Sequence, residues 1–176
     1  MELLAAFVGG ILGVIGAFAG VWLSNLYQSR AQKQQTLRDT TISLYAELTG
    51  AEMLTSRMKA SKILDENAQK QMPLTISELS TNIDTAFEDW YPVGRVLTFF
   101  EKLGVYLKAG YLDEELAREL MGGVAIYWYD HYFANLIQDV DLTQIERSDP
   151  LKDVNEWLEP YRTQLKYAKR EHVRKP

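Results

Sequence analysis

The chain begins with a run of uncharged residues long enough to constrain both its fold and its location. Leu3–Leu23 holds 21 residues without one charged side chain. As a helix this run is roughly 30 Å long, which matches the hydrocarbon thickness of a bilayer. A phosphate-binding loop needs a preceding strand or a Lys-Ser/Thr pair, and neither is present. A cleaved signal normally has a basic start, whereas the only charge before this run is Glu2. We therefore predict a transmembrane anchor over residues 1–24.

The flanks of the run predict its orientation. Arg30, Lys33 and Arg38 follow it, and no Lys or Arg precedes it. Because basic residues stay on the cytoplasmic side, the N-terminus is expected outside, and the residues after the anchor in the cytoplasm. Trp22 and Tyr27 fit an interfacial aromatic belt at that end. The predicted location is thus the inner (cytoplasmic) membrane, crossed once, with membrane lipid as a partner.

Small residues recur along one face of this predicted anchor, at spacings of four, three, four and four. They are Gly9, Gly13, Gly16, Gly20 and Ser24. Two such pairs match the small-xxx-small pattern that lets membrane helices approach closely. We predict self-association through this stripe, or pairing with another membrane protein. The alternative is that glycine is simply common in membrane helices.

Composition narrows the possible chemistry. The chain has no cysteine, so disulfides, thiolate metal sites and a cysteine nucleophile are excluded. The two histidines, His131 and His172, lack the Glu-x-x-His spacing of a di-iron bundle, and we expect no metal and no cofactor. Nucleic acid is not expected as a partner, because the net charge is −5. We also expect no enzymatic activity.

The rest of the chain, residues 25–176, reads as one cytoplasmic helical domain. We predict an all-α fold, in which the single transmembrane helix is followed by a bundle of about four to five helices. Residues 25–62 contain no proline and carry a seam at heptad spacing. Its members are Leu37, Thr41, Leu44, Leu48, Ala51, Thr55 and Met58. This helix could continue the membrane helix with little break.

Turn and capping signals divide the chain after residue 62 into further helices. Residues 63–76 are predicted to be a loop, with Ser77 or Thr81 capping the next helix. Pro92 and Gly94 are expected to interrupt it before an amphipathic helix over 95–109. Gly110 is placed to end that helix, and Asp113 to cap another that runs to about residue 138. A last helix is expected over about 151–171.

One block of the sequence resembles a known family. Residues 95–123, RVLTFFEKLGVYLKAGYLDEELARELMGG, with the aromatic YWYDHYF after them, are similar to the domain-of-unknown-function 4760 family. The similarity is best over 95–130, and it departs at Thr98, where an asparagine is expected. It implies a short bacterial or phage protein, often with an N-terminal membrane helix before a helical domain. The anchor-plus-helices layout is also similar to phage abortive-infection membrane proteins.

Three groups of side chains are candidates for a site. Arg95 and Glu101 are six positions apart, so each is expected to pair with another helix. The aromatic stretch 127–133 suits core packing, and alternatively a ligand pocket formed by Trp128, His131 and Tyr132. A basic tail over about 166–176 could contact anionic lipid, or could simply suit the end of a helix. Its basic residues are Lys166, Lys169, Arg170, Arg174 and Lys175.

Three functions follow as hypotheses. The first is a membrane-anchored helical protein that acts by protein–protein interaction, as a scaffold or accessory subunit. The second is a membrane sensor or effector in phage defence, which rests on the resemblance. The third is a small-ligand binder or enzyme that uses the aromatics at 127–133.

Overall fold

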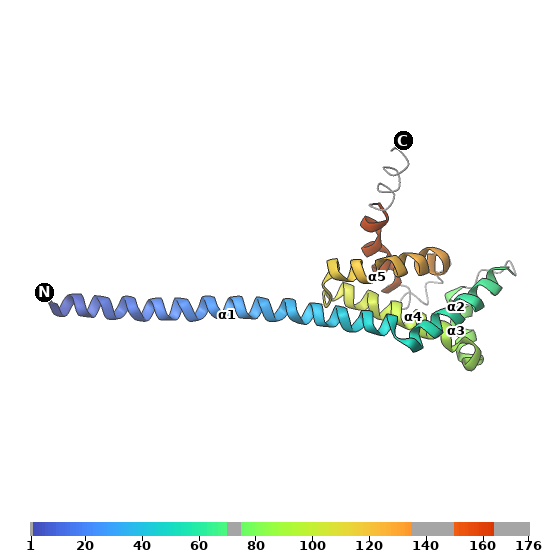
Figure 1. The fold of residues 1–176 in the computed structure, drawn as a ribbon, viewed down its shortest axis with the longest axis horizontal. Coiled ribbons are helices and arrows are strands. Elements are labelled where there is room, and N and C mark those ends of the chain that lie inside the picture. The colour runs from blue at the N-terminus through green and yellow to red at the C-terminus, as the bar shows by residue number, and fades with distance from the viewer. Residues whose placement is uncertain (1, 70–74, 135–149, 164–176) are drawn as a thin grey trace, which may run out of the picture. The chain divides into compact units, whose positions relative to one another are not determined.

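The computed structural model describes residues 2–69, 75–134 and 150–163, with side chains described from Gly20 onward except at 76–77. Every element in these ranges is helical, which confirms the all-α fold class (Figure 1). The elements are α1 (Glu2–Thr49), α2 (Ala51–Gln69), α3 (Ile76–Thr85), α4 (Phe87–Lys108), α5 (Glu114–Trp128) and the π-helical turn η1 (Tyr129–Phe133). A further helix covers 150–163.

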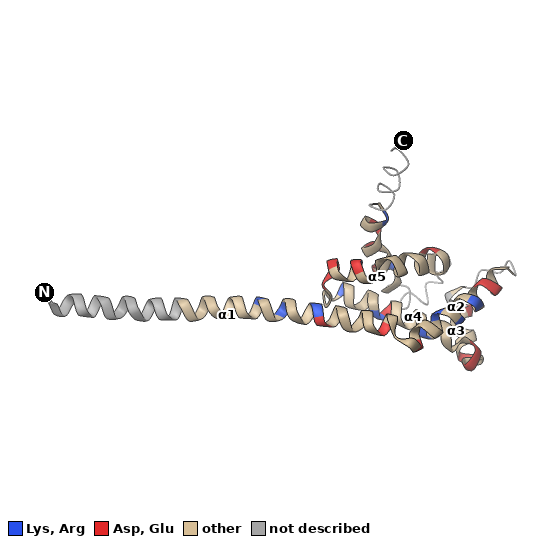
Figure 2. Ribbon diagram, in the orientation of Figure 1, with Lys and Arg blue, Asp and Glu red and all other residues tan. Residues whose placement is uncertain are grey.

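Helix α1 is continuous over 48 residues, so the uncharged run and the start of the predicted cytoplasmic helix form one element. Among the residues whose side chains are described, no helix contains a stretch that is long and apolar enough to cross a bilayer. The predicted anchor, residues 1–24, falls mostly on side chains that lie outside that part of the chain. Figure 2 marks the first basic residues of α1 beyond the run.

The chain divides into two units, residues 1–39 and residues 40–176. The first unit is the N-terminal part of α1, where every described side chain from Gly20 to Thr36 is exposed. The second contains the end of α1 and all the other helices. The division lies within α1, later in the chain than the predicted boundary near residue 24.

The predicted heptad seam is wrong beyond Gly50. Thr41, Leu44 and Leu48 are buried, but α1 ends at Thr49 and the chain bends at Gly50 before α2 begins. After this bend α2 buries Met53, Ser56, Ala60 and Leu64 instead of the predicted seam residues. Met58, a predicted seam residue, is 75% exposed. A straight-helix periodicity could not anticipate this change of direction.

Thr41 shows why a threonine occupies a seam position. Its side chain is fully buried, and its hydroxyl accepts a hydrogen bond from the backbone N–H of Asp113 at 3.0 Å. Asp113 in turn caps α5, since its carboxylate accepts from the N–H of Leu116 at 3.2 Å, as predicted. The hydroxyl therefore ties the end of α1 to the start of α5.

The predicted loop over 63–76 is wrong for residues 63–69, which continue α2. Glu66, Ala68 and Gln69 are good helix formers, and Leu64 is buried, so the helix gains packing by continuing. Residues 70–74 lie outside the described residues. The cap of the next helix is Thr75, in place of the predicted Ser77 or Thr81. Thr75 and Glu78 form a capping box with each other's backbone N–H.

The predicted interruption at Pro92 and Gly94 is wrong, because α4 runs through both. Pro92 lies near the helix start and is buried, so the cost of one missing backbone bond is offset by packing. The break lies earlier, at Ala86, which ends α3 and begins α4 with φ −129° and ψ 54°. Gly110 follows the end of α4 with φ +66°, a conformation that favours glycine.

The core is built from buried side chains of all the helices in the second unit, from the end of α1 to the helix over 150–163. Phe100 is central to it, with its ring 5.4 Å from Phe99 and 5.2 Å from Phe133. The approach of α4 to Pro150 is very close, because a Cβ on Gly104 would lie 1.9 Å from the Pro150 carbonyl oxygen. Glycine is thus required at position 104. The helices predicted to reach residues 138 and 171 are described only to residues 134 and 163.

Candidate functional site

A pocket of about 330 Å³ opens along α4. Most of its lining comes from α4, with Glu47 of α1, Met53 of α2 and Ile83 of α3 completing the wall. All of these residues belong to the second unit, residues 40–176. A cavity of this size with mixed apolar and charged walls is typical of a binding site.

Two aromatic side chains at the pocket are open to solvent. Phe87 is 58% exposed and Tyr91 is 44% exposed, and their ring centroids lie 5.3 Å apart. Both line the pocket, one helical turn apart on α4. Neighbouring exposed aromatics are more informative than scattered ones, because contiguous apolar surface commonly marks an interaction site.

The basic side chains of the pocket are paired with carboxylates on other helices. Arg95 donates to Glu52 of α2 at 2.7 Å, and this bond is the main cause that raises the pKa of Arg95. Lys102 contacts Glu47 of α1 at 2.6 Å. These pairs tie α4 to the corner formed by α1 and α2. They are partly exposed, so they contribute mainly to the relative placement of the helices.

The structure brings the two candidate ion-pair residues into this same pocket. Arg95 pairs with another helix, as described above, and Glu101 lies about two turns further along α4 with one carboxylate oxygen, Oε1, buried. Thr98, where the family resemblance departs from its expected asparagine, lies between them and is exposed. The block that carries the resemblance therefore supplies much of the pocket wall.

The three aromatic candidates Trp128, His131 and Tyr132 do not converge on one pocket. Trp128 is 2% exposed and belongs to the core. His131 is exposed, its ring stacks on Tyr127 at 4.5 Å, and its Nδ1–H donates to the Tyr127 carbonyl oxygen at 3.0 Å. Tyr132 donates from its hydroxyl to Asp65 of α2 at 3.1 Å. Each side chain is thus engaged locally, in a different direction.

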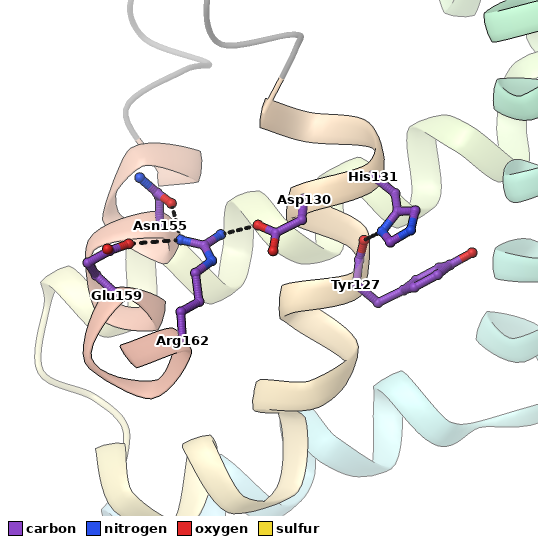
Figure 3. Close-up of polar contacts among 6 residues, drawn as sticks. All are labelled: Tyr127, Asp130, His131, Asn155, Glu159 and Arg162. Carbon is purple, nitrogen blue, oxygen red and sulfur yellow. Dashed lines mark hydrogen bonds and ion pairs between the residues drawn. The ribbon is translucent and has the colours of Figure 1, made fainter. Parts of the chain in front are cut away.

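A polar network around Arg162 joins η1 to the helix over 150–163 (Figure 3). Arg162 donates to Asp130 at 2.5 Å, to Asn155 at 2.6 Å and to Glu159 at 3.2 Å. Its guanidinium also lies 5.0 Å from the centre of the Tyr129 ring. The Arg162 side chain is only 13% exposed, so these contacts act in a partly desolvated setting.

The π-helical turn η1 sets the directions in which its own side chains point. Tyr129 and Phe133 both point into the core, while Asp130 is exposed and faces Arg162. His131 points away from Asp130, which separates the two groups that an acid–base pair would need (Figure 3). Single π turns often occur at functional sites, and here the turn joins two helices that are distant in sequence.

Burial raises the pKa of two tyrosines in this region. For Tyr129, desolvation is the main cause, and the nearby Arg162 partly opposes it. For Tyr132, desolvation is again the main cause, followed by hydrogen bonds to Tyr127 and Asp65. Both phenols therefore stay protonated well into the alkaline range.

The sequence did not predict the Arg162 network or the exposed aromatics Phe87 and Tyr91. The spacing of Glu159 and Arg162 is the one local signal, since residues three apart on a helix are neighbours. The contact with Asp130 spans 32 positions along the chain and has no local signature.

The remaining candidates lie mostly outside the described residues. This applies to the side chains of Gly9, Gly13 and Gly16, and to the whole basic tail from Lys166 onward. Gly20 is described and has no atom within 4 Å of where a Cβ would stand. Ser24 accepts a hydrogen bond from Gln28 at 3.4 Å. Within the described ranges, no group of three or more potential ligands is arranged to hold a metal ion.

Comparison with known proteins gives a family and no named relative. A family model described as "Domain of unknown function (DUF4760)" matches residues 4–150. The match extends well beyond residues 95–130, where the resemblance is best, and it includes α1 from residue 4 onward, the pocket and the π turn. No curated protein and no solved structure matches the chain. The residues that line the pocket are thus part of a larger match. The chain belongs to the DUF4760 family of domains of unknown function.

Proposed function

We propose that this protein is a single-pass membrane protein whose helical domain binds a protein partner at the cytoplasmic face. In this proposal residues 1–24 form the anchor, and the pocket along α4 belongs to the binding surface. The protein acts as a scaffold or accessory subunit and catalyses no reaction. Its expected location is the inner (cytoplasmic) membrane, with the N-terminus outside.

The observation that carries the proposal is the form of α1. One helix holds the uncharged run Leu3–Leu23 and continues to Thr49. At the end of the run the described side chains of Val21, Trp22 and Leu23 are 61%, 65% and 49% exposed. A lone helix with exposed large apolar side chains needs another apolar environment, and a bilayer supplies one.

A binding role is supported by the chemistry of the pocket. Its exposed aromatic pair, Phe87 and Tyr91, supplies apolar contact area, and the ion pairs Arg95–Glu52 and Lys102–Glu47 supply polar groups beside it. Protein interfaces combine an apolar centre with a polar rim in this way. The side chains at 127–133 that suggested an enzyme are instead engaged in packing and in hydrogen bonds to neighbouring residues.

The anchor is tested by fractionation of cells that express the full chain. An integral protein remains in the membrane pellet after alkaline carbonate washing and is released by detergent. Replacing Ile15 with Asp at the middle of the run is expected to move the protein out of the pellet, because a central charge strongly disfavours insertion. Gln28→Asp, beyond the run, is the matched control and is expected to stay in the pellet.

Self-association through the glycine stripe is tested in detergent. The full chain is expected to be oligomeric by mass, and the double variant Gly13→Leu, Gly16→Leu is expected to lose that oligomer, because leucine prevents close helix approach. An unchanged oligomer in the variant would remove the stripe from the proposal. Release of the wild-type chain by carbonate would refute the anchor itself.

A further inference from the structure

The stretch of α1 that follows the uncharged run carries apolar and basic side chains on one face. Leu23, Leu26, Arg30 and Lys33 are spaced by three, four and three positions, so they lie along one stripe of the helix. All four are exposed, the two leucines by 49% and 38%. The stripe is therefore apolar beside the run and basic within about two helical turns of it.

The two basic side chains of this stripe have no acidic neighbour along the helix. Residues 3–38 contain no Asp or Glu, so α1 shows basic residues before its first described acidic one (Figure 2). Ion pairs on a helix join residues three or four apart, and Asp39 is six positions from Lys33. Within the part of the chain that the structure describes, neither Arg30 nor Lys33 makes an ion pair or a side-chain hydrogen bond. Both charges are thus available to an external anion.

Polar side chains on either side of these two residues are, by contrast, engaged within α1. Gln28 donates to Ser24 at 3.4 Å, and Gln35 donates to Asp39 at 3.0 Å. The nearest acidic group therefore already accepts a hydrogen bond from a residue of its own helix.

Two exposed aromatic side chains lie beside the basic pair. Trp22 is 65% exposed, and Tyr27, three positions before Arg30, is 71% exposed. Rings of this kind sit at the headgroup level of a bilayer, and each carries one polar hydrogen that can be donated. Together with a guanidinium and an ammonium group they form a set of hydrogen-bond donors. Phosphate oxygens, which accept hydrogen bonds, are complementary to such a set.

The spacing along α1 fits a lipid headgroup when Leu23 marks the edge of the hydrocarbon. Arg30 is seven residues further, which is about 10 Å along the helix. The headgroup layer is roughly 5–8 Å thick on each side of a bilayer. Helical side chains lean toward the N-terminus of their helix, which in the proposed topology is toward the bilayer. Long basic side chains therefore reach back to the phosphates.

From these observations we propose that α1 binds the phosphate groups of anionic phospholipids through Arg30 and Lys33. Zwitterionic phospholipids carry the same phosphate, but a cation in their own headgroup balances it, so the anionic class is preferred. Each basic residue near an anionic surface is expected to favour that lipid roughly five-fold. The inference rests on the proposed anchor, because without it the stripe does not meet the headgroups.

Quenching of tryptophan by brominated lipids tests this preference in the full-length protein. The protein is reconstituted into vesicles of equal parts phosphatidylglycerol and phosphatidylcholine, with bromine on the acyl chains of one lipid or of the other. The chain has four tryptophans, so Trp22→Phe measured in parallel gives the background to subtract. Brominated phosphatidylglycerol is expected to quench Trp22 more strongly than brominated phosphatidylcholine, because the anionic lipid gathers beside the basic pair.

A double variant and a matched control assign the preference to these residues. Arg30→Gln with Lys33→Gln is expected to make the two brominated lipids quench Trp22 equally, since the lipids then differ little in their attraction to α1. Lys59→Gln with Lys62→Gln removes the same charge from exposed positions on α2 and is expected to keep the difference.

The outcomes separate the inference from the anchor. Equal quenching of Trp22 by both lipids in the natural chain would overturn the lipid preference and leave the anchor standing. A preference that survives in the Arg30 and Lys33 double variant would overturn the assignment to these two side chains. Absence of Trp22 quenching by either lipid would refute the anchor, and the inference with it.

Discussion

Replacing Gly104 with alanine should destabilise the fold because of one close contact. An ideal Cβ at this position lies 1.9 Å from the Pro150 carbonyl oxygen, 2.5 Å from its carbonyl carbon and 2.8 Å from its Cα. Non-bonded heavy atoms rest about 3.5 Å apart, so α4 and the helix over 150–163 must separate by more than about 1 Å. The obstacle is backbone, which cannot rotate away as a side chain can.

The expected magnitude follows from two opposing effects. Overpacking a core typically costs about 1–3 kcal/mol, and a backbone clash belongs at the upper end, about 3 kcal/mol. Alanine favours the helix over glycine by about 1 kcal/mol, which offsets part of this cost. The net loss is about 2 kcal/mol. For a chain of 176 residues it corresponds to a fall in Tm of roughly 4–8 °C.

Gly123→Ala provides the matched control. Gly123 is in α5, is exposed, and has no atom within 4 Å of an added Cβ. Its replacement should stabilise the helix by about 0.5–1 kcal/mol. Urea unfolding of both full-length variants in detergent, followed by circular dichroism, measures the difference. Gly104→Ala as stable as the wild type, with Gly123→Ala behaving as expected, would refute the close approach at Pro150.

Three further outcomes are expected. Asp113→Ala should lose about 1 kcal/mol of unfolding free energy because α5 loses its cap, and Asp113→Asn should retain most of it, as urea titration can show. Arg162→Met should lose about 1–3 kcal/mol, and Asp130→Asn less, because Arg162 is 13% exposed and Asp130 is 45% exposed; equal losses in the same titration would contradict this. The stability that depends on the buried phenols of Tyr129 and Tyr132 should be fully present below about pH 10 and fall as the pH rises further, because burial raises the pKa of both and unfolding then releases protons. Tyr129→Phe should remove its share of that fall in unfolding midpoints measured across this range, and an unchanged slope would exclude Tyr129 as a contributor.

The sequence predicted those helix ends that depend on only a few adjacent residues. Asp113 caps α5 and Gly110 follows the end of α4, because capping depends on a few adjacent residues. The continuity of α1 was raised from the sequence only as a possibility, although no proline interrupts the chain before Gly50. Helical periodicity was sufficient to assign the all-α class.

The errors arose where tertiary packing outweighs local preference. Pro92 was read as a break, but its buried ring packs within α4, and the break falls at Ala86, which has no turn signature. The bend at Gly50 changes which face of α2 is buried, and no repeat pattern carries that information.

The candidate site shows the same division. Arg95 was expected to pair with another helix, yet its partner Glu52 lies 43 positions away and could not be named from spacing. The pocket requires α1, α2 and α3 to meet α4, which periodicity along one helix does not specify. No sequence rule predicts the π turn at Tyr129–Phe133 as reliably as capping residues predict helix ends. The Arg162 network that depends on this turn was therefore missed.

The side on which each part of the chain lies is the most direct test of the account. Single cysteines at Glu2 and Met58 can be probed with a membrane-impermeant maleimide in intact and permeabilised cells, because the natural chain has no cysteine. Labelling of Glu2→Cys is expected in cells whose inner membrane is intact, and labelling of Met58→Cys only after that membrane is permeabilised. Labelling of both variants only after permeabilisation, with the protein in the soluble fraction, would contradict it.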